Sequence, residues 1–387
     1  MRTSWVMAAL ASVSLLAGTT AAAASARPPI RIGEIAALTG PTALTGLQEQ
    51  MGAKLAVAEI NRAGGVLGRP LKLITLDFGG SVQTGVADYR RLVEDDHVSA
   101  VIGTNFSNVN IAMAPVTQRL KVPDLSDSID LRATMQPDGK PYTYAFLAQP
   151  SADAWGRIMA KVALHLLKAR RAAILLNQDN AFAVAQAKPF EAYFSAHGGK
   201  IVSVQEYTSS TTEYTSLLTT IAASHPQVVL IPNYGQHDGL AVQEARQLGL
   251  KAYFLGPNTF STPDYTKVAG AAADGTYFVN NVDLLSPRYR GFDAAFRKMF
   301  HSAPKTVNAF FGYDDVHIIA AAIAKAHSSS PAAITRALDH LKNVPILEGN
   351  GTFTMDAALH RPLRMPVTVF EWVKGRAVDK GLLSSAN

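Results

Sequence analysis

The order of apolar and polar positions along the chain alternates between two periods. Short apolar runs, such as residues 30–36, have the length and composition of buried strands, whereas residues 47–63 repeat their apolar positions with helical spacing. Gly64 and Gly65 follow this helical stretch, and glycine is the residue that most readily ends a helix. Regular alternation of this kind predicts parallel sheets with helices on both faces.

Two series of such segments predict an α/β protein with two doubly wound, Rossmann-like lobes. The expected strands are residues 30–36, 71–77, 100–103, 122–126 and 144–147 in the first series, and 172–176, 201–207, 228–232 and 253–255 in the second. The expected helices are residues 47–63, 86–95, 111–120, 153–167, 187–197, 214–224 and 239–248. A single (β/α)₈ barrel has the same periodicity and stays as the alternative.

The final part of the chain departs from this alternation. Helical periodicity covers residues 292–300, 307–327 and 331–341, with no strand between the last two. Residues 349–356 and 365–373 are then expected to pair as two strands. No internal repeat or low-complexity linker sets this part aside, so we expect it to complete one or both lobes.

The first 26 residues have the pattern of an export signal. Arg2 precedes an apolar stretch at residues 5–17, and small residues then lead to Ala24-Ser25-Ala26, an A-x-A cleavage pattern. The apolar stretch is shorter than the about 20 residues that a membrane span requires. We therefore expect cleavage near Ala26 and release of a soluble protein into the periplasm.

Composition narrows the possible partners. The chain has 387 residues, enough for two domains, and carries a net charge of +6. No run of lysine or arginine is longer than two residues, which argues against a nucleic-acid partner. Cysteine is absent, so the exported protein depends on a large core rather than on disulfides.

Polar loops follow the predicted strands, where ligands bind in open parallel sheets. After the third strand, Ser107, Asn108 and Asn110 precede a helix whose free N–H groups favour an anion. Residues 39–46, 126–130, 177–182, 233–238 and 256–261 form similar loops, rich in hydroxyl and amide groups. Each loop alone is also explained by helix capping, but together they indicate a site for a small polar or zwitterionic ligand.

Patterns for catalysis or cofactor binding are missing from the sequence. There is no G-x-G-x-x-G or G-K-[ST] for a nucleotide and no G-x-S-x-G nucleophile elbow. Asp314, Asp315 and His317 lack a known metal-ligand spacing, and the neighbours His237 and Asp238 cannot easily face each other as a dyad. We therefore expect neither an enzyme nor a bound cofactor or metal.

Several segments, in order, resemble exported type I solute-binding proteins of the leucine/isoleucine/valine group. They include "IRIGEIAALTGPTALTGLQEQMGAKLAVAEINRAGGVLGRPLKLITLD", "AVIGTNFSNVNIAMAPV", "YGQHDGLAVQEARQLGLKAYFLGP" and "FFGYDDVHIIAAAIAKA". The resemblance implies one lobe at residues 30–147 plus 281–347 and another at 148–280 plus 348–378, with a tail at 379–387. It also implies three crossovers near Leu147, Asn280 and Leu347 and a ligand cleft between the lobes. The implied partners are an ABC permease and its ATPase.

The resemblance also assigns roles to particular residues. Ser107 and the backbone of Asn108 match the pair that holds an α-carboxylate. Phe182 falls on a tyrosine that covers the ligand, and Tyr234 matches a Tyr-Gly pair. Thr45 stands where the family often has tyrosine.

Two departures from the family pattern bear on the ligand. Asn258 replaces the acid that holds an α-ammonium, and Ile129-Asp130 replaces Ala-Thr. One hypothesis is that Asp130 takes over the ammonium, so that amino acids still bind. The competing hypothesis is that the ligand is an amide, a urea-like compound or an aromatic acid. A ligand-sensing module of the same fold is the alternative to a transport protein.

Overall fold

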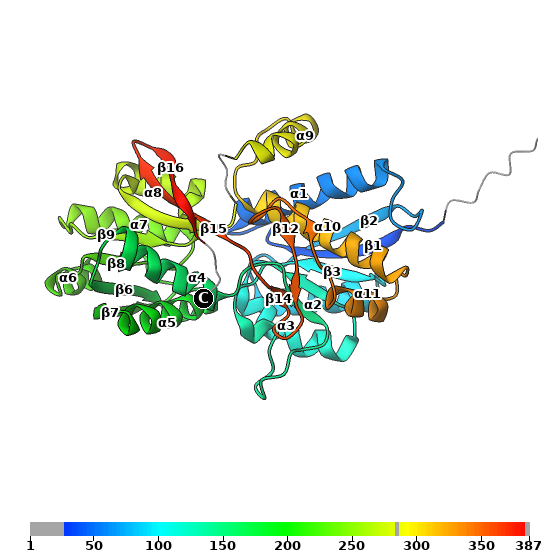
Figure 1. The fold of residues 1–387 in the computed structure, drawn as a ribbon, viewed down its shortest axis with the longest axis horizontal. Coiled ribbons are helices and arrows are strands. Elements are labelled where there is room, and N and C mark those ends of the chain that lie inside the picture. The colour runs from blue at the N-terminus through cyan, green and yellow to red at the C-terminus, as the bar shows by residue number, and fades with distance from the viewer. Residues whose placement is uncertain (1–26, 283–285, 384–387) are drawn as a thin grey trace, which may run out of the picture.

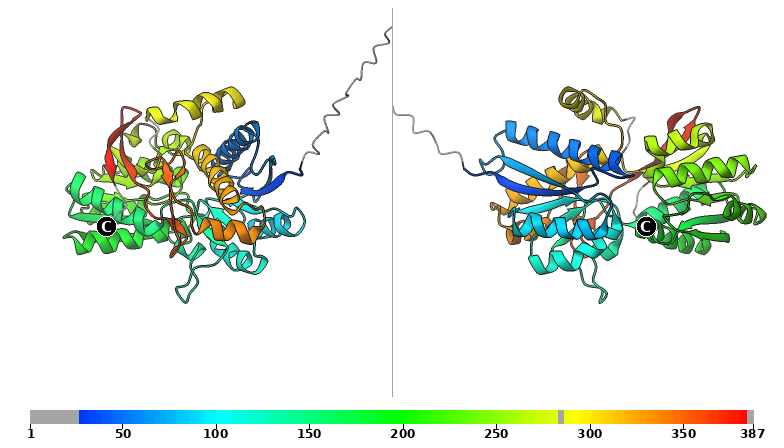
Figure 2. Two further views of the ribbon diagram at one scale, coloured as in Figure 1. Left: turned by 45° about the vertical axis from the view of Figure 1, so that its right-hand side comes forward. Right: turned by 180° about the vertical axis from the view of Figure 1, so that it is seen from behind.

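The computed structural model describes residues 27–282 and 286–383, which form two lobes lying side by side (Figure 1). Each lobe has a central sheet with helices on both faces, as the turned views show (Figure 2). The expected fold class of two doubly wound lobes is confirmed. The expected export signal lies outside the described residues. Among the described residues, no helix has both the length and the apolar character needed to span a bilayer.

The first lobe contains a parallel five-stranded sheet. Its strands are β1 (Ile30–Ala36), β2 (Leu71–Asp77), β3 (Ala100–Gly103), β4 (Asp124–Ser126) and β5 (Ala145–Leu147), in the order β2-β1-β3-β4-β5. Its helices are α1 (Ala43–Arg62), α2 (Val82–Glu94), α3 (Ser107–Leu120), α9 (Arg290–Phe300), α10 (Asn308–Ala326) and α11 (Pro331–Leu338). Ile32 of β1 packs in the core formed with α1, α10 and α11, whereas Ile35 faces the core with α2 and α3.

The second lobe contains a mixed seven-stranded sheet in the order β16-β15-β10-β9-β8-β6-β7. Its strands are β6 (Arg171–Asn177), β7 (Lys200–Tyr207), β8 (Val228–Leu230), β9 (Tyr253–Gly256), β10 (Thr276–Asn280), β15 (Val367–Val373) and β16 (Arg376–Leu383). Its helices are α4 (Ala152–Lys161), continued by a π-helical turn (Val162–Leu166), α5 (Ala181–Ala196), α6 (Thr215–Ala223), α7 (Gly235–Gln247) and α8 (Pro263–Ala269). Strands β6 to β10 are parallel, and β15 and β16 complete the edge as an antiparallel pair.

The last strands differ from the sequence prediction. Residues 349–356 and 365–373 do not pair with each other; β15 instead lies between β10 and β16. The first four residues of β15 are all buried, so this strand is internal and needs a partner on each edge. The expected tail after residue 378 is therefore wrong in part, because β16 continues to Leu383.

The third passage between the lobes also comes later than expected. Met365 packs in the core of the first lobe and Val367 in that of the second, so the chain crosses there rather than near Leu347. The segment before the crossing lies on the first lobe and forms two short pairs, β11 (Val344–Pro345) with β12 (Thr352–Phe353) and β13 (Met355–Asp356) with β14 (Arg361–Pro362).

Three polar side chains connect two of the segments that run between the lobes, those after β5 and β10, with the segment after β11 in the first lobe. Gln149 follows β5, Asn281 follows β10, and Glu348 follows β11; all three are buried. The Gln149 amide nitrogen donates to Glu348 Oε2 at 2.8 Å. The Asn281 amide nitrogen donates to Gln149 Oε1 at 2.5 Å and also to Glu348. These bonds hold the connecting segments together at the base of the space between the lobes.

Candidate ligand-binding site

A cavity of about 140 Å³ lies between the two lobes. The first lobe contributes the start of α1, the loops after β3 and β4, and the start of α10. The second lobe contributes α4, α5, the start of α7 and the loop after β9. The volume of this cavity is comparable with that of an apolar cavity of about 150 Å³ that holds a benzene molecule in another protein. The space therefore suits a single amino acid or a single substituted ring.

Aromatic side chains from both lobes form much of the wall. The ring centroids of Phe106 in the first lobe and Tyr234 in the second lie 5.3 Å apart. Those of Phe182 and Tyr234, both in the second lobe, lie 5.4 Å apart. Trp155 and Phe311 add to this lining. Such ring pairs gain stability beyond the burial of their apolar surface, so they help hold the two lobes together.

Five of the nine residues singled out in the sequence line this cavity. They are Thr45, Ile129, Phe182, Tyr234 and Asn258. They come from five different loops or helix starts, as expected where the carboxyl ends of parallel strands converge. The other four, Ser107, Asn108, Asn110 and Asp130, have different positions and are described in turn.

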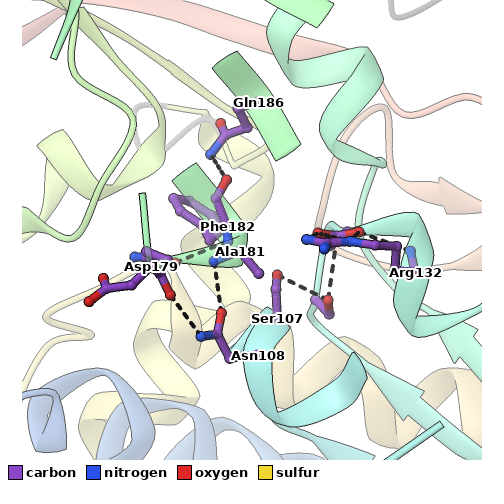
Figure 3. A network of polar contacts seen from close by, with 10 residues as sticks. Ser107, Asn108, Arg132, Asp179, Ala181, Phe182 and Gln186 are labelled. Atoms are coloured by element: carbon purple, nitrogen blue, oxygen red, sulfur yellow. Dashed lines mark hydrogen bonds and ion pairs between the residues drawn. The ribbon is translucent and has the colours of Figure 1, made fainter. Parts of the chain in front are cut away.

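Ser107 and Asn110 are buried behind the wall rather than in it. The Ser107 hydroxyl oxygen accepts a hydrogen bond of 3.1 Å from Ser128 (Figure 3). The Asn110 amide donates to the carbonyls of Thr104 at 2.7 Å and Phe106 at 3.2 Å, which fixes the loop between β3 and α3. This loop places the Phe106 ring against Tyr234.

Asn108 joins the lobes directly. Its amide nitrogen donates to the Asp179 carbonyl at 3.0 Å, and its amide oxygen accepts from the Ala181 N–H at 2.8 Å (Figure 3). Asn108 lies at the start of α3 in the first lobe, whereas Asp179 and Ala181 lie where α5 begins in the second. The backbone contact of Asn108 to a carboxylate stays a prediction, and its side chain forms these two interlobe hydrogen bonds, here called the Asn108 clasp.

Asp130 is not free to hold an ammonium group, and this correction has a simple cause. Arg132 lies two residues further on, and its guanidinium contacts both carboxylate oxygens, the shortest contact being 2.6 Å (Figure 3). The Asp130 side chain also caps the short helix at Leu131–Ala133 by accepting from the Arg132 N–H. Asp130 therefore has a complete set of partners and does not line the cavity.

Asp127, three residues earlier, does reach the cavity, which Asp264 of α8 also lines. Asp127 Oδ1 accepts from the Gln149 amide at 3.0 Å, while its Oδ2 has no hydrogen-bond partner although the residue is buried. Burial raises the pKa of Asp127 to about 7, and the Gln149 hydrogen bond opposes that rise. The sequence placed Asp127 in the correct loop, but the alternation of side chains near the strand end decides which acid points inward.

Two further cavity residues present unpaired polar atoms. Trp155 Nε1 is a buried donor without a partner, and Gln186 Oε1 is a buried acceptor without one. The other end of the Gln186 amide is fixed, because its nitrogen donates to the Phe182 carbonyl at 2.9 Å (Figure 3). Because buried polar groups are nearly always satisfied, these atoms mark where a ligand finds its partners. Neither residue carried a signal in the sequence, since both lie within helices.

The neighbours His237 and Asp238, which the sequence analysis did not expect to face each other as a dyad, have separate partners. His237 Nδ1 bonds the Tyr214 hydroxyl at 2.7 Å, whereas Asp238 accepts from Thr259 at 2.9 Å. Burial lowers the pKa of His237, which favours the neutral ring. Among the described residues, no lysine or arginine lines the cavity. The cavity is thus largely apolar, with a few hydrogen-bonding groups and two acids, Asp127 and Asp264.

The chain belongs to the periplasmic binding protein family, whose model matches residues 29–377. It is 28% identical over 375 residues to a Leu/Ile/Val-binding protein homolog of Brucella melitensis, covering 95% of this chain and 98% of that protein.

Two solved structures share the fold. The branched-chain amino acid transporter substrate-binding protein LivJ of Streptococcus pneumoniae, in complex with isoleucine, has a TM-score of 0.81 and 24% identity, covering 92% of this chain and 99% of that chain. A solute-binding protein from R. palustris, in complex with 4-hydroxybenzoate, has a TM-score of 0.80 and 20% identity, covering 92% of this chain and 96% of that chain.

Proposed function

We propose that this protein is the exported solute-binding component of an ABC importer, which traps one small solute between its lobes and delivers it to a membrane permease. The observation that carries the proposal is the cavity walled by both lobes, because a solute held there stabilises the closed arrangement. Membership of the periplasmic binding protein family supports the same function.

The solute we favour is an amino acid with an apolar side chain, of the branched-chain type or a close relative. The cavity is small, and rings from both lobes offer an apolar surface. Asp127 Oδ2 can accept from an ammonium group, and Trp155 Nε1 can donate to a carboxylate oxygen. The Leu/Ile/Val-binding relative supports this class of solute.

An aromatic acid is the second candidate, because five aromatic side chains line the cavity: Phe106, Trp155, Phe182, Tyr234 and Phe311. The similar fold of the 4-hydroxybenzoate complex supports it. Against it stands the charge of the wall, which includes Asp127 and, in the described residues, no lysine or arginine. An anion without a countercharge loses affinity in such a site.

Calorimetric titration of the purified protein separates these candidates. We expect heat and 1:1 binding with leucine, isoleucine or valine, and none with 4-hydroxybenzoate, urea or acetamide. Binding of 4-hydroxybenzoate alone would transfer the assignment to aromatic acids. Binding of urea or acetamide alone would assign the site to small amides.

Transport and sensing are separated in cells. Deleting the gene should abolish uptake of the radiolabelled solute, and restoring the full chain should recover it. Unchanged uptake in the deletion strain, together with a lost transcriptional response to the solute, would indicate a sensor. The amino terminus of the periplasmic protein should begin near Arg27, which mass spectrometry of the intact protein measures.

A further inference from the structure

Three buried carboxyl groups meet beneath the solute cavity. Glu49 comes from α1, Asp127 from the loop after β4, and Asp315 from α10, with exposed fractions of 2%, 4% and 0%. One oxygen of each lies within 4.8 Å of an oxygen of the other two. Only Asp127 also lines the cavity, so it connects this group of carboxyls to the space between the lobes.

Close packing of two helices brings these groups together. A Cβ at Gly52 of α1 would lie 1.8 Å from the Ala309 carbonyl oxygen, and one at Gly312 of α10 would lie 2.1 Å from the Glu49 carbonyl oxygen. Only glycine permits so close an approach at these two positions. Glu49 and Asp315 therefore face a common space because the helix backbones almost touch.

The three carboxyls lack the partners that neighbouring acids have. Both oxygens of Asp315, Oε1 of Glu49 and Oδ2 of Asp127 have no hydrogen-bond partner. By contrast, Asp314 accepts from two backbone N–H groups at 2.8–3.0 Å, and Glu348 accepts from the Gln149 and Asn281 amides. Across residues 27–282 and 286–383, no salt bridge reaches the three.

Burial of three carboxylates, each with at least one unpaired oxygen, is unfavourable unless protons or a cation neutralise them. The arrangement is also suited to a cation, because oxygens around one Ca²⁺ lie about 2.4 Å from it and so at most about 4.8 Å apart. Carboxylate oxygens are the donors that hard divalent cations prefer.

We propose that Glu49, Asp127 and Asp315 bind one hard divalent cation of the Ca²⁺ or Mg²⁺ class beneath the solute cavity. The cation enters through the cavity past Asp127 and neutralises the floor of the site. It links α1, α10 and the β4 loop, next to the Gln149–Asn281–Glu348 connection between the lobes. Because the cation and the ammonium group of an amino acid both need Asp127, the two compete for this carboxyl, and the metal site is therefore tested without solute.

Terbium luminescence tests the site without any solute. The full chain is stripped with EDTA, dialysed and titrated with Tb³⁺, with excitation of tryptophan, since Trp155 lines the same cavity as Asp127. We expect sensitised emission that saturates at one ion per chain and that Ca²⁺ displaces. Calorimetry with Ca²⁺ and Mg²⁺ alone then gives the affinities.

The decisive variant is Asp315→Asn, and Asp124→Asn is its matched control. Asp124 is also a buried acid of the first lobe with an unpaired oxygen, but it is not one of the three. Asp315→Asn should weaken Ca²⁺ binding by more than about tenfold, whereas Asp124→Asn should leave it unchanged. Removing an unpaired buried charge should not lower the melting temperature in EDTA, so loss of binding is separable from unfolding.

Three outcomes overturn the proposal. The first is that neither Ca²⁺ nor Mg²⁺ binds at millimolar concentration. The second is full binding by Asp315→Asn, which would place the ion elsewhere. The third is proton release on solute binding in EDTA with no metal binding, which would show that the carboxyls serve a solute cation or simply hold protons. Because the metal titrations need no solute, a failure of the metal site can be told apart from a failure of the proposed transport function.

Discussion

At the scale of single residues, the site depends on which side chains lack partners inside the protein. Asp130 has Arg132, whereas Asp127 Oδ2 and Trp155 Nε1 have none and border the cavity. Tyr234 matters for another reason, because its ring contacts Phe106 of the first lobe and Phe182 of the second. We therefore expect substitutions to change binding most at residues that have an unpaired polar atom at the cavity or a ring in contact with both lobes.

Substitution Tyr234→Ala should weaken solute binding by at least about thirtyfold, the effect expected for a binding hot spot. The ring contacts Phe182 in its own lobe and Phe106 across the cleft, so its loss opens the wall on both sides. Calorimetry with the solute identified above measures the change. Tyr193→Ala is the control, because Tyr193 stacks on His197 and does not line the cavity. Equal losses in the two variants would contradict the assignment.

The buried carboxyl of Glu34 makes the stability of the fold depend on pH. Burial raises its pKa from 4.5 to about 7, opposed by the Thr75 hydroxyl, which donates to it at 2.5 Å. The folded state therefore binds more protons than the unfolded state between these values, and stability falls as pH rises from about 4.5 to about 7.

Glu34→Gln should remove this part of the pH dependence. The free energy of unfolding of the variant minus that of the wild type should be larger at pH 8 than at pH 5. Urea denaturation at both pH values measures the difference, and the exposed Glu206 supplies the control Glu206→Gln. A variant whose stability changes with pH as the wild type's does would show that Glu34 stays ionised in the fold.

At the scale of elements, four helices, α1, α2, α3 and α7, begin about one turn before the residues where their apolar periodicity becomes visible. The sequence predicted a start at residue 111 for α3 and 239 for α7, whereas these helices begin at Ser107 and Gly235. The first turns of α3 and α7 consist mostly of small and polar residues, so they show no apolar repeat. The strand positions and the polar loops after them were predictable, but the inward direction of Asp127 and the Asn108 clasp depend on three-dimensional packing.

The last two strands form the edge of the second lobe, and β16 covers β15. The sequence missed β16 because residues 376–383 alternate weakly and include Asp379 and Lys380. Removing residues 376–387 should leave β15 as an exposed edge with buried residues such as Phe370. We expect a lower melting temperature and aggregation in size-exclusion chromatography. Removal of residues 384–387 alone is the control, and an equal effect would contradict the role of β16.

At the scale of the whole molecule, closure rests on contacts at two levels of the cleft. The Gln149–Asn281–Glu348 connection lies at its base, and the Asn108 clasp joins the start of α3 to the start of α5. The rings and the cavity lie between the lobes as well. These contacts stabilise the closed arrangement in addition to those of a solute, and whatever raises the population of the closed state raises the apparent affinity.

Substitution Asn108→Ala should shift the free protein towards an open arrangement, because it removes two interlobe hydrogen bonds of 3.0 and 2.8 Å. Each is worth about 1 kcal/mol, so solute affinity should fall by about tenfold to thirtyfold. Small-angle X-ray scattering without solute should show a larger radius of gyration. Asn61→Ala is the matched control, because the Asn61 side chain also makes two bonds to backbone, of 2.9 and 2.7 Å with Leu71, but within the first lobe. Asn61→Ala should lower stability and leave affinity unchanged; if both variants bind solute as the wild type does, the clasp does not contribute to closure.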